Sequence, residues 1–338
     1  MKILRSSRFI AAGLLCGLLV TPLASADPLQ FALVAKRIDH DFFISAAKGC
    51  AEAAQAQGDT CLLLGASGAS HFRRQNEALE QALARGLDGI ALSVTHSKWL
   101  ANHALKRANK TPLITFDSDL EPAEQHLRRG YVGLDNLAFG RQLGMLAQRL
   151  RPQGGKLCVL SGSSRDTNHR ERLRGIRQQL RGDQAESRAA DRLNRQNGWS
   201  EPNRCPLYDT DNQESALLKL TTLLNSTNQY DTIISLGSWP VHHADIYRRQ
   251  LGPLLARLKA KGTSPTIIIA IPEFDTALRP LLEDGLVQAY LSMESREIGR
   301  QSYRLLKSLV RGEPIPERIF VDSHAYLSEV PSDIPTER

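Results

Sequence analysis

Short apolar runs alternate with segments of helical length along almost the whole chain, and this alternation restricts the fold more than any other feature of the sequence. We expect strands at 29–35, 61–65, 89–94, 112–117, 131–134, 156–161, 204–208, 232–237, 266–271 and 287–292. We expect helices near 43–57, 70–85, 97–109, 136–150, 168–181, 212–226, 241–261, 274–284 and 295–311. Continuous apolar strands that alternate with helices are typical of parallel sheets covered on both faces. The sequence therefore predicts an α/β protein.

The alternation begins again after Pro152–Gly155, which indicates two similar lobes rather than one large sheet. Residues 29–65 and 156–208 both read as strand, helix and strand. A chain of 338 residues is long enough for two domains of ordinary size. Residues 183–203 are expected to form a long surface loop, because this stretch follows Gly182 and contains Asn194, Asn197, Gly198 and Pro202.

The first 26 residues have the pattern of a cleavable export signal. Three basic residues precede an apolar run over 9–20, and the small residues 24–26 follow. This run is too short to span a bilayer, and no later segment reaches the roughly 20 apolar residues that a spanning helix needs. Cys16 follows Leu15 rather than a small residue, which argues against a lipoprotein. We therefore expect cleavage after Ala26 and a mature protein in the periplasm.

The composition fits a globular protein and excludes some classes of partner. Hydrophobic residues make up 41% of the chain and charged residues 23%, which is ordinary for a folded protein. Loss of the signal removes three basic residues and lowers the formal net charge from +7 to +4. The basic stretch 170–181 has no interleaved aromatic residues, so we interpret it as a solvated helix face. We expect no nucleic-acid partner.

Four cysteines remain after the signal: Cys50, Cys61, Cys158 and Cys205. An even number in an oxidising compartment suggests disulfides, with three possible pairings. Each lobe would hold two of the four in its first strand–helix–strand unit, where adjacent parallel strands lie about 4.8 Å apart. This arrangement favours the pairs Cys50–Cys61 and Cys158–Cys205. Buried free thiols are the alternative.

Polar and aromatic side chains follow the expected strands, where open α/β sheets bind their ligands. The candidates are His40, Phe42, Phe43, Ser93, Asp117 and Asp135 in the first half, and Arg170, Asp211, Trp239 and Glu273 in the second. Aromatic rings can stack on the apolar faces of sugars, and charged planar groups form strong hydrogen bonds with hydroxyls. This set of residues indicates a polyhydroxylated ligand.

Most of these candidates also have a simpler possible role. Phe42 and Phe43 could belong to the core, although helical phase would let only one of two adjacent residues face the sheet. Asp117 could cap a helix, Arg170 could lie on the surface, and Trp239 could close the core. The remaining candidates could serve as loop or hinge residues: His40, Asp135 and Glu273.

Several ordered segments carry a resemblance to a known family: Phe31–Gly49, Leu113–Asp117, Val132–Asn136, Arg170–Arg172, Glu283–Gly285 and Glu297–Gly299. Together they resemble the type I periplasmic sugar-binding proteins, typified by ribose-binding protein. The resemblance implies two Rossmann-like lobes joined by a three-segment hinge that closes on a ligand. Residues 27–134 and 294–321 would form the N-terminal lobe, and 135–293 and 322–338 the C-terminal lobe.

The resemblance also implies particular ligand contacts. Carried over by position, the ligand-binding residues are Phe42, Phe43, Asp117 and Arg170, with Glu273 near a family aspartate. His40 and Ser93 stand where ribose binders carry asparagines, and Asp211 where they carry a phenylalanine. These departures indicate a retained scaffold with a changed ligand.

The resemblance implies a monomeric solute-binding protein that delivers a sugar or polyol to an ABC importer. The alternative is a periplasmic sensing subunit whose closed form is read by a membrane sensor kinase or chemoreceptor. A transcription regulator of this fold is disfavoured because an export signal occupies the place of a DNA-binding motif.

Catalysis and metal binding are both disfavoured by the motifs. A GxSxG nucleophile elbow, a P-loop and GxGxxG are all missing from the sequence, and no cofactor is expected. No Cys or His spacing indicates zinc. His242 and His243 would point apart on a helix, so we expect no metal there.

Overall fold

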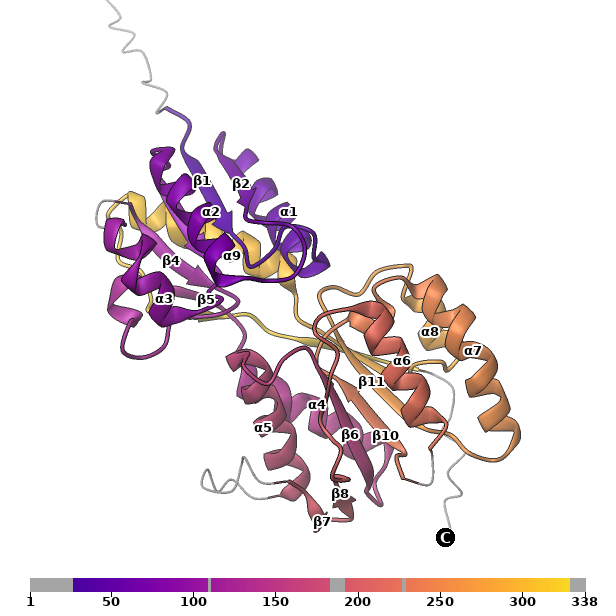
Figure 1. Ribbon diagram of the computed structural model, residues 1–338. Coiled ribbons are helices and arrows are strands. Elements are labelled where there is room, and N and C mark those ends of the chain that lie inside the picture. The colour runs from indigo at the N-terminus through magenta and orange to yellow at the C-terminus, as the bar shows by residue number, and fades with distance from the viewer. Residues whose placement is uncertain (1–26, 109–110, 183–191, 227–228, 329–338) are drawn as a thin grey trace, which may run out of the picture.

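The computed structural model describes residues 27–108, 111–182, 192–226 and 229–328. The predicted export signal lies outside these residues. Two sheets flanked by helices make up the fold, which confirms the predicted α/β architecture with two Rossmann-like lobes (Figure 1). Among the described helices, none has both the length and the apolar character that crossing a membrane requires.

The first sheet has six parallel strands in the order β13-β5-β4-β3-β1-β2. They are β1 (Gln30–Val34), β2 (Thr60–Leu64), β3 (Gly89–Leu92), β4 (Leu113–Phe116), β5 (Tyr131–Gly133) and β13 (Arg318–Phe320). Its helices are α1 (Asp41–Gln55), α2 (Phe72–Ala84), α3 (Ser97–Asn102) and α9 (Ser295–Val310), with the short 3₁₀ helices η1 (Ala104–Arg107) and η2 (Gln125–Leu127).

Burial on both faces explains why β1 reads as a continuous apolar run. Phe31 and Leu33 join a core cluster with α1 and α9, whereas Ala32 and Val34 join a separate cluster with α2 and α3. Alternate residues of a strand point to opposite faces, so a strand covered on both sides needs apolar residues at every position.

The second sheet has eight strands, with β14-β12-β11-β10-β6-β8-β7 in order and β9 also paired to β6. They are β6 (Gly155–Ser161), β7 (Asn194–Gln196), β8 (Trp199–Ser200), β9 (Leu207–Tyr208), β10 (Thr232–Ser235), β11 (Thr266–Ile271), β12 (Ala289–Ser292) and β14 (His324–Leu327). Its helices are α4 (Asn136–Leu150), α5 (Thr167–Arg181), α6 (Gln213–Leu224), η4 (Trp239–Val241), α7 (Ala244–Ala260) and α8 (Arg279–Glu283).

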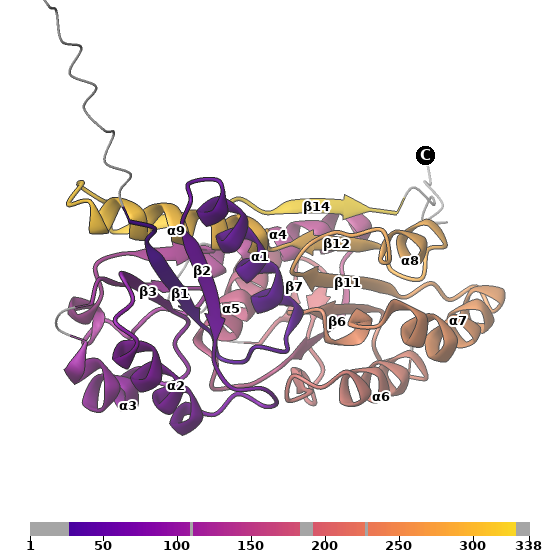
Figure 2. The ribbon, with the colours of Figure 1, turned by 90° about the horizontal axis from the view of Figure 1, so that it is seen from above.

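The described chain passes from one sheet to the other between β5 and α4, between β12 and α9, and between β13 and β14. Figure 2 shows α9 and β14 along one edge of the molecule, where the last of these passages runs from the first lobe to the second. The residue boundaries expected for the two lobes stay a prediction.

Two disulfides tie helices and loops to the sheets. Cys50 of α1 is bonded to Cys61 of β2, with Cα atoms 5.8 Å apart. Cys158 of β6 is bonded to Cys205, with Cα atoms 5.2 Å apart. These are the pairs that the order of strands and helices favours.

The predicted surface loop at 183–203 was wrong over 194–200. Residues 183–191 lie outside the described part, but β7 and β8 form an antiparallel hairpin, and β8 pairs with β6. Asn197 and Gly198 take positive φ values at its turn, which suits a tight hairpin connection. Trp199 is buried in the core as a result.

Candidate functional site

An ion-pair cluster joins the two lobes where the carboxyl ends of their strands face each other. Lys36, just after β1, places its Nζ 3.4 Å from Asp117 Oδ2 of the first lobe and 3.1 Å from Asp166 Oδ2 of the second. The side chains of Lys36, Asp117 and Asp166 are 13%, 11% and 22% exposed. The three groups therefore form one largely enclosed polar site that spans both lobes.

Asp117 is held in an unusual backbone conformation directly after β4. Its φ is 58°, in the left-handed region that non-glycine residues seldom adopt. Its backbone N–H donates to Val132 O at 3.0 Å, and its carbonyl accepts from the Tyr131 hydroxyl at 3.0 Å. Ser93 Oγ donates to the carboxylate at 2.7 Å. Strain of this kind persists where surrounding contacts fix it, and it is common at ligand sites.

The first turn of α5 brings the second lobe onto Asp117. Asp166 caps this helix by accepting from His169 N at 3.0 Å through Oδ1, which leaves Oδ2 for Lys36. Asn168 Nδ2 donates to the Asp117 carbonyl at 3.0 Å and to Ser118 Oγ at 2.9 Å. A short stretch of helix thus contributes both an anion and an amide to the same cluster.

Lys36 and Asp166 stay charged at neutral pH. Burial opposes a charge on Lys36, but Asp117 and Asp166 outweigh it and hold the pKa of Lys36 above its usual value. Burial likewise disfavours the Asp166 carboxylate, yet Lys36 and the backbone N–H of His169 hold its pKa well below the usual range. Lys36 and Asp166 therefore form an ion pair between the lobes.

Two histidines border the cluster and are neutral at pH 7. Burial lowers the pKa of His169, whose ring packs edge-on against Trp239 with centroids 5.4 Å apart. Burial also lowers the pKa of His40, which caps α1 by accepting from Phe42 N at 3.2 Å. Both rings can therefore exchange hydrogen bonds with a neutral ligand.

Two aspartates follow β9 on the same side of the second lobe. Asp211 has a φ of 57° and interacts electrostatically with Lys36, His40 and His169. Asp209 is fully buried; its Oδ1 accepts from Asp211 N at 3.0 Å, and Oδ2 has no hydrogen-bond partner among the described residues. Burial raises the pKa of Asp209 to about 8. Asp211 therefore adds an acceptor to the site, while Asp209 is largely protonated at neutral pH.

Comparison with known proteins gives the family. Residues 31–314 match the family model of the periplasmic binding protein domain. The chain belongs to the periplasmic binding protein family. Proteins of this family are non-enzymatic components of transport systems. No curated protein matches the sequence.

Solved structures of similar fold cover most of the chain. The glucose-galactose binding protein GanP of Geobacillus stearothermophilus has a TM-score of 0.72 at 18% identity, covering 92% of this chain and 100% of its own. A solute-binding protein of Burkholderia graminis in complex with D-arabinose has a TM-score of 0.71 at 18% identity, covering 89% and 96%. One of Actinobacillus succinogenes with bound D-allose has a TM-score of 0.70 at 17% identity, covering 89% and 98%. At these identities the similarity shows the fold.

In this periplasmic binding protein the predicted site residues occupy different environments. Ser93, Asp117, His40, Asp211 and Trp239 lie at or beside the inter-lobe cluster, as described above. Trp239 is 6% exposed and packs against Gly162 and Gly237, where an added Cβ would lie 2.9 Å and 2.7 Å from its ring. These two glycines therefore give the indole room beside the backbone.

Phe42 and Phe43 are both buried, at 5% exposure each. Their rings meet edge to face at 5.2 Å, and Phe43 packs edge-on against Phe116 at 6.1 Å. Both side chains belong to one core cluster of buried residues, which is the simpler of the two roles considered for them. Their role in stacking on a ligand stays a prediction.

Arg170, Asp135 and Glu273 lie outside the cluster. Arg170 is exposed and donates to Thr167 Oγ1 at 3.2 Å. Asp135 caps α4 by accepting from Ala138 N at 2.9 Å. Glu273 accepts from Arg296 N at 2.6 Å, beside one of the passages between the lobes. Their role in ligand binding stays a prediction.

The sequence prediction placed the stretch 161–170 where a ligand would bind, but it did not single out several residues at or beside the cluster: Lys36, Asp166, Asn168, His169 and Arg172. Arg172 is buried and donates to Asn136 Oδ1 and Leu236 O, both at 2.8 Å. Lys36 had a usable signal, since a lysine directly after an apolar strand lies where ligands bind. The described residues contain no group of His, Cys, Asp and Glu suited to a metal ion.

Proposed function

We propose that this chain is a periplasmic solute-binding protein that captures a sugar or sugar-like polyol between its lobes and delivers it to an ABC importer. The observation that carries the proposal is the cluster of Lys36, Asp117 and Asp166, which draws a donor and two acceptors from both lobes. A hydroxyl both donates and accepts, so a polyol can accept from Lys36 while it donates to the two carboxylates.

A ligand that contacts both lobes favours the closed form over the open one by its difference in affinity for the two. Asp117 and Ser93 would hold it from the first lobe, and Asp166 and Asn168 from the second. The bound sugars of the similar structures, D-arabinose and D-allose, have several hydroxyls each and support this chemistry.

The predicted export signal supports a periplasmic location, and the family supports an ABC permease as the partner that receives the closed form. Neighbouring genes distinguish delivery from sensing. Permease and ATPase genes beside this one would support transport, whereas a membrane sensor kinase gene in their place would assign the closed form to signalling.

The test is a thermal-shift screen of residues 27–338, unfolded and refolded beforehand to remove any carried ligand. The panel holds pentoses, hexoses, polyols, nucleosides and furanoses. A ligand that binds only the native state raises its melting temperature by mass action, so one class should stand out by several degrees. A flat screen of the refolded protein would overturn the assignment to sugars and polyols.

Calorimetry with the compound found then tests the site. Asp117→Asn and Asp166→Asn each exchange a carboxylate for an amide of similar shape, and each should weaken binding by about 2 kcal/mol, roughly thirtyfold in Kd. Asp245→Asn is the matched control, because Asp245 pairs with Arg249 on the exposed surface of α7. Unchanged affinity in the first two variants would remove the cluster from the binding site.

A further inference from the structure

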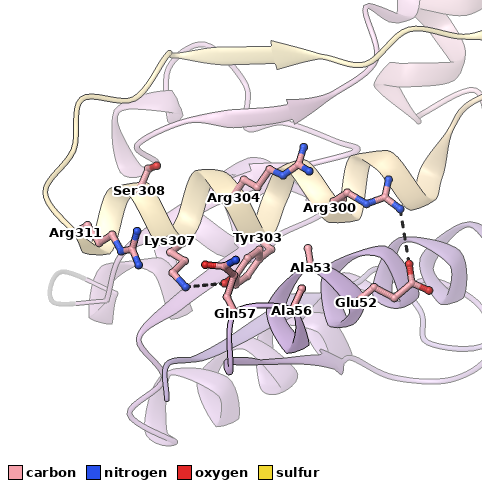
Figure 3. Close-up of a pocket in the computed structure, with 10 residues that line it drawn as sticks. All are labelled: Glu52, Ala53, Ala56, Gln57, Arg300, Tyr303, Arg304, Lys307, Ser308 and Arg311. Atoms are coloured by element: carbon pink, nitrogen blue, oxygen red, sulfur yellow. Dashed lines mark hydrogen bonds and ion pairs between the residues drawn. The ribbon is translucent and has the colours of Figure 1, made fainter. Parts of the chain in front are cut away.

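A groove of about 450 Å³ lies between α1 and α9 on the first lobe (Figure 3). It is lined by Glu52, Ala53, Ala56, Gln57, Arg300, Tyr303, Arg304, Lys307, Ser308 and Arg311. None of these residues belongs to the inter-lobe cluster. We call it the α1/α9 groove, and its role is separate from that of the ligand site.

The lining of the α1/α9 groove is strongly cationic. Arg300, Arg304, Lys307 and Arg311 stand at steps of four, three and four residues along α9, so they share one side of the helix. Glu52 is the one carboxylate in the lining. The lining itself therefore carries more positive than negative charge, and the acids that offset part of this charge lie outside the lining: Asp59, Glu297 and Glu313.

Two of these cations have close acidic neighbours and two have distant ones. Lys307 Nζ lies 2.8 Å from the buried Asp59, and Arg300 is paired with Glu297. Arg304 and Arg311 lie 3.7 Å and 4.0 Å from their acidic neighbours, and their side chains are 58% and 56% exposed. Contacts this long at the surface contribute little, so both guanidinium groups can turn to a better partner.

The shape of the groove selects the kind of anion. Ala53 and Ala56 of α1 lie opposite the cations, and their small side chains help to leave the groove open (Figure 3). A concave groove between two helices does not fit a flat lipid surface. From Arg300 to Arg311 the row of cations extends about 16 Å at a rise of about 1.5 Å per residue. A small anion would occupy a fraction of that length.

We propose that the α1/α9 groove docks an acidic polypeptide segment of the membrane protein that receives this binding protein. Carboxylates at every second residue of an extended segment repeat at about 6.7 Å, close to the step of about 6 Å between cations four residues apart on a helix. Arginine binds a carboxylate in a bidentate, directional way, which suits recognition of such a segment. The groove gives the partner a contact outside the cleft.

The test uses a fluorescein-labelled peptide of twelve residues with alternating Glu and Ala, and follows its anisotropy as the mature protein is added at low salt. The double variant Arg304→Glu/Arg311→Glu should raise the Kd at least tenfold. Arg249→Glu/Arg257→Glu on α7 makes the same change in net charge away from the groove and should leave the Kd within twofold of wild type. Ala56→Trp fills the groove without changing its charge and should also weaken binding.

No binding by the wild-type protein, or an equal loss in the α7 control, would overturn the proposal. A preference for vesicles with anionic lipid over the peptide, lost in the groove variant, would overturn it in favour of a membrane surface. Binding of the cleft ligand is measured on the same variants and should be unchanged. A result that contradicts docking in the α1/α9 groove is thereby distinguished from a result that contradicts the proposed solute-binding function.

Discussion

Replacement of Lys36 by methionine should release the two lobes from each other. The ammonium of Lys36 is the cation that lies between Asp117 and Asp166, so its loss leaves two carboxylates facing each other in an enclosed site. Removing one partner of a fully buried ion pair costs about 3–5 kcal/mol, whereas exposed pairs contribute about 0–1 kcal/mol. With side chains 11–22% exposed, we expect about 2 kcal/mol.

That free energy acts on closure rather than on the stability of each lobe. When the lobes separate, both carboxylates regain water, so the penalty is removed by opening. A loss of about 2 kcal/mol shifts the ratio of closed to open molecules by roughly thirtyfold. Small-angle X-ray scattering of the ligand-free protein should therefore give a larger radius of gyration for Lys36→Met than for wild type.

Lys98→Met removes an exposed lysine from α3 and serves as the control. The double variant Lys36→Met/Asp166→Asn removes one of the two facing carboxylates and should return part of the closed population. An unchanged scattering profile in Lys36→Met would refute the reasoning. So would strictly additive effects in the cycle, because residues in one ion-pair network are expected to couple.

Two further predictions concern protonation and the disulfides. His242 Nδ1 lies 2.5 Å from Asp41 of the other lobe, and this hydrogen bond raises the pKa of His242. The ion pair is fully formed below the unfolded pKa of histidine, near 6.5, and is lost as pH rises through the raised pKa of His242 in the folded protein. Because the pair joins the two lobes, calorimetry should find tighter ligand binding at pH 6 than at pH 8. His242→Gln should abolish this difference between the two pH values. The two disulfides close loops of sequence separation 47 and 11, so replacing Cys158 and Cys205 by alanine should lower the free energy of unfolding in urea by about 1 kcal/mol more than replacing Cys50 and Cys61. Equal losses would contradict the loop-entropy argument.

The fold was predictable because the local pattern and the tertiary structure demand the same residues. A strand such as β1, covered by α1 and α9 on one face and by α2 on the other, is apolar at every position. The hairpin at 194–200 was not predictable in this way. Its strands are very short, and its largest core contribution is Trp199, which stands directly after the turn residues Asn197 and Gly198.

The site was predictable as a region but not residue by residue. Strand order shows where polar side chains gather, which brought Ser93 and Asp117 into the prediction. It does not show which of them meet across two lobes, because that depends on the angle between the lobes. Arg170 and Arg172 show the limit, since two residues along a helix turn a side chain by about 200°. Arg172 is buried against the second lobe, and Arg170 is exposed.

The charges of the inter-lobe site also restrict the ligand. Asp117, Asp166 and Asp211 bring three carboxylates to it, against the ammonium of Lys36 and the guanidinium of Arg172. The neighbouring imidazoles add no charge at neutral pH, because burial lowers the pKa of His40 and of His169. Arg172 keeps its positive charge, because its hydrogen-bond partners Asn136 Oδ1 and Leu236 O are neutral, so the site holds three carboxylates and two cations.

An anionic ligand would therefore enter a site that already carries excess negative charge, and like charges in an enclosed site repel strongly. Whichever neutral sugar binds, its phosphate ester and its uronic acid should bind at least tenfold more weakly in competition calorimetry. Asp211→Asn should narrow that gap, because it removes one of the repelling carboxylates and keeps the shape of the side chain. Equal binding of the neutral and anionic forms would show that the carboxylates face away from the bound ligand.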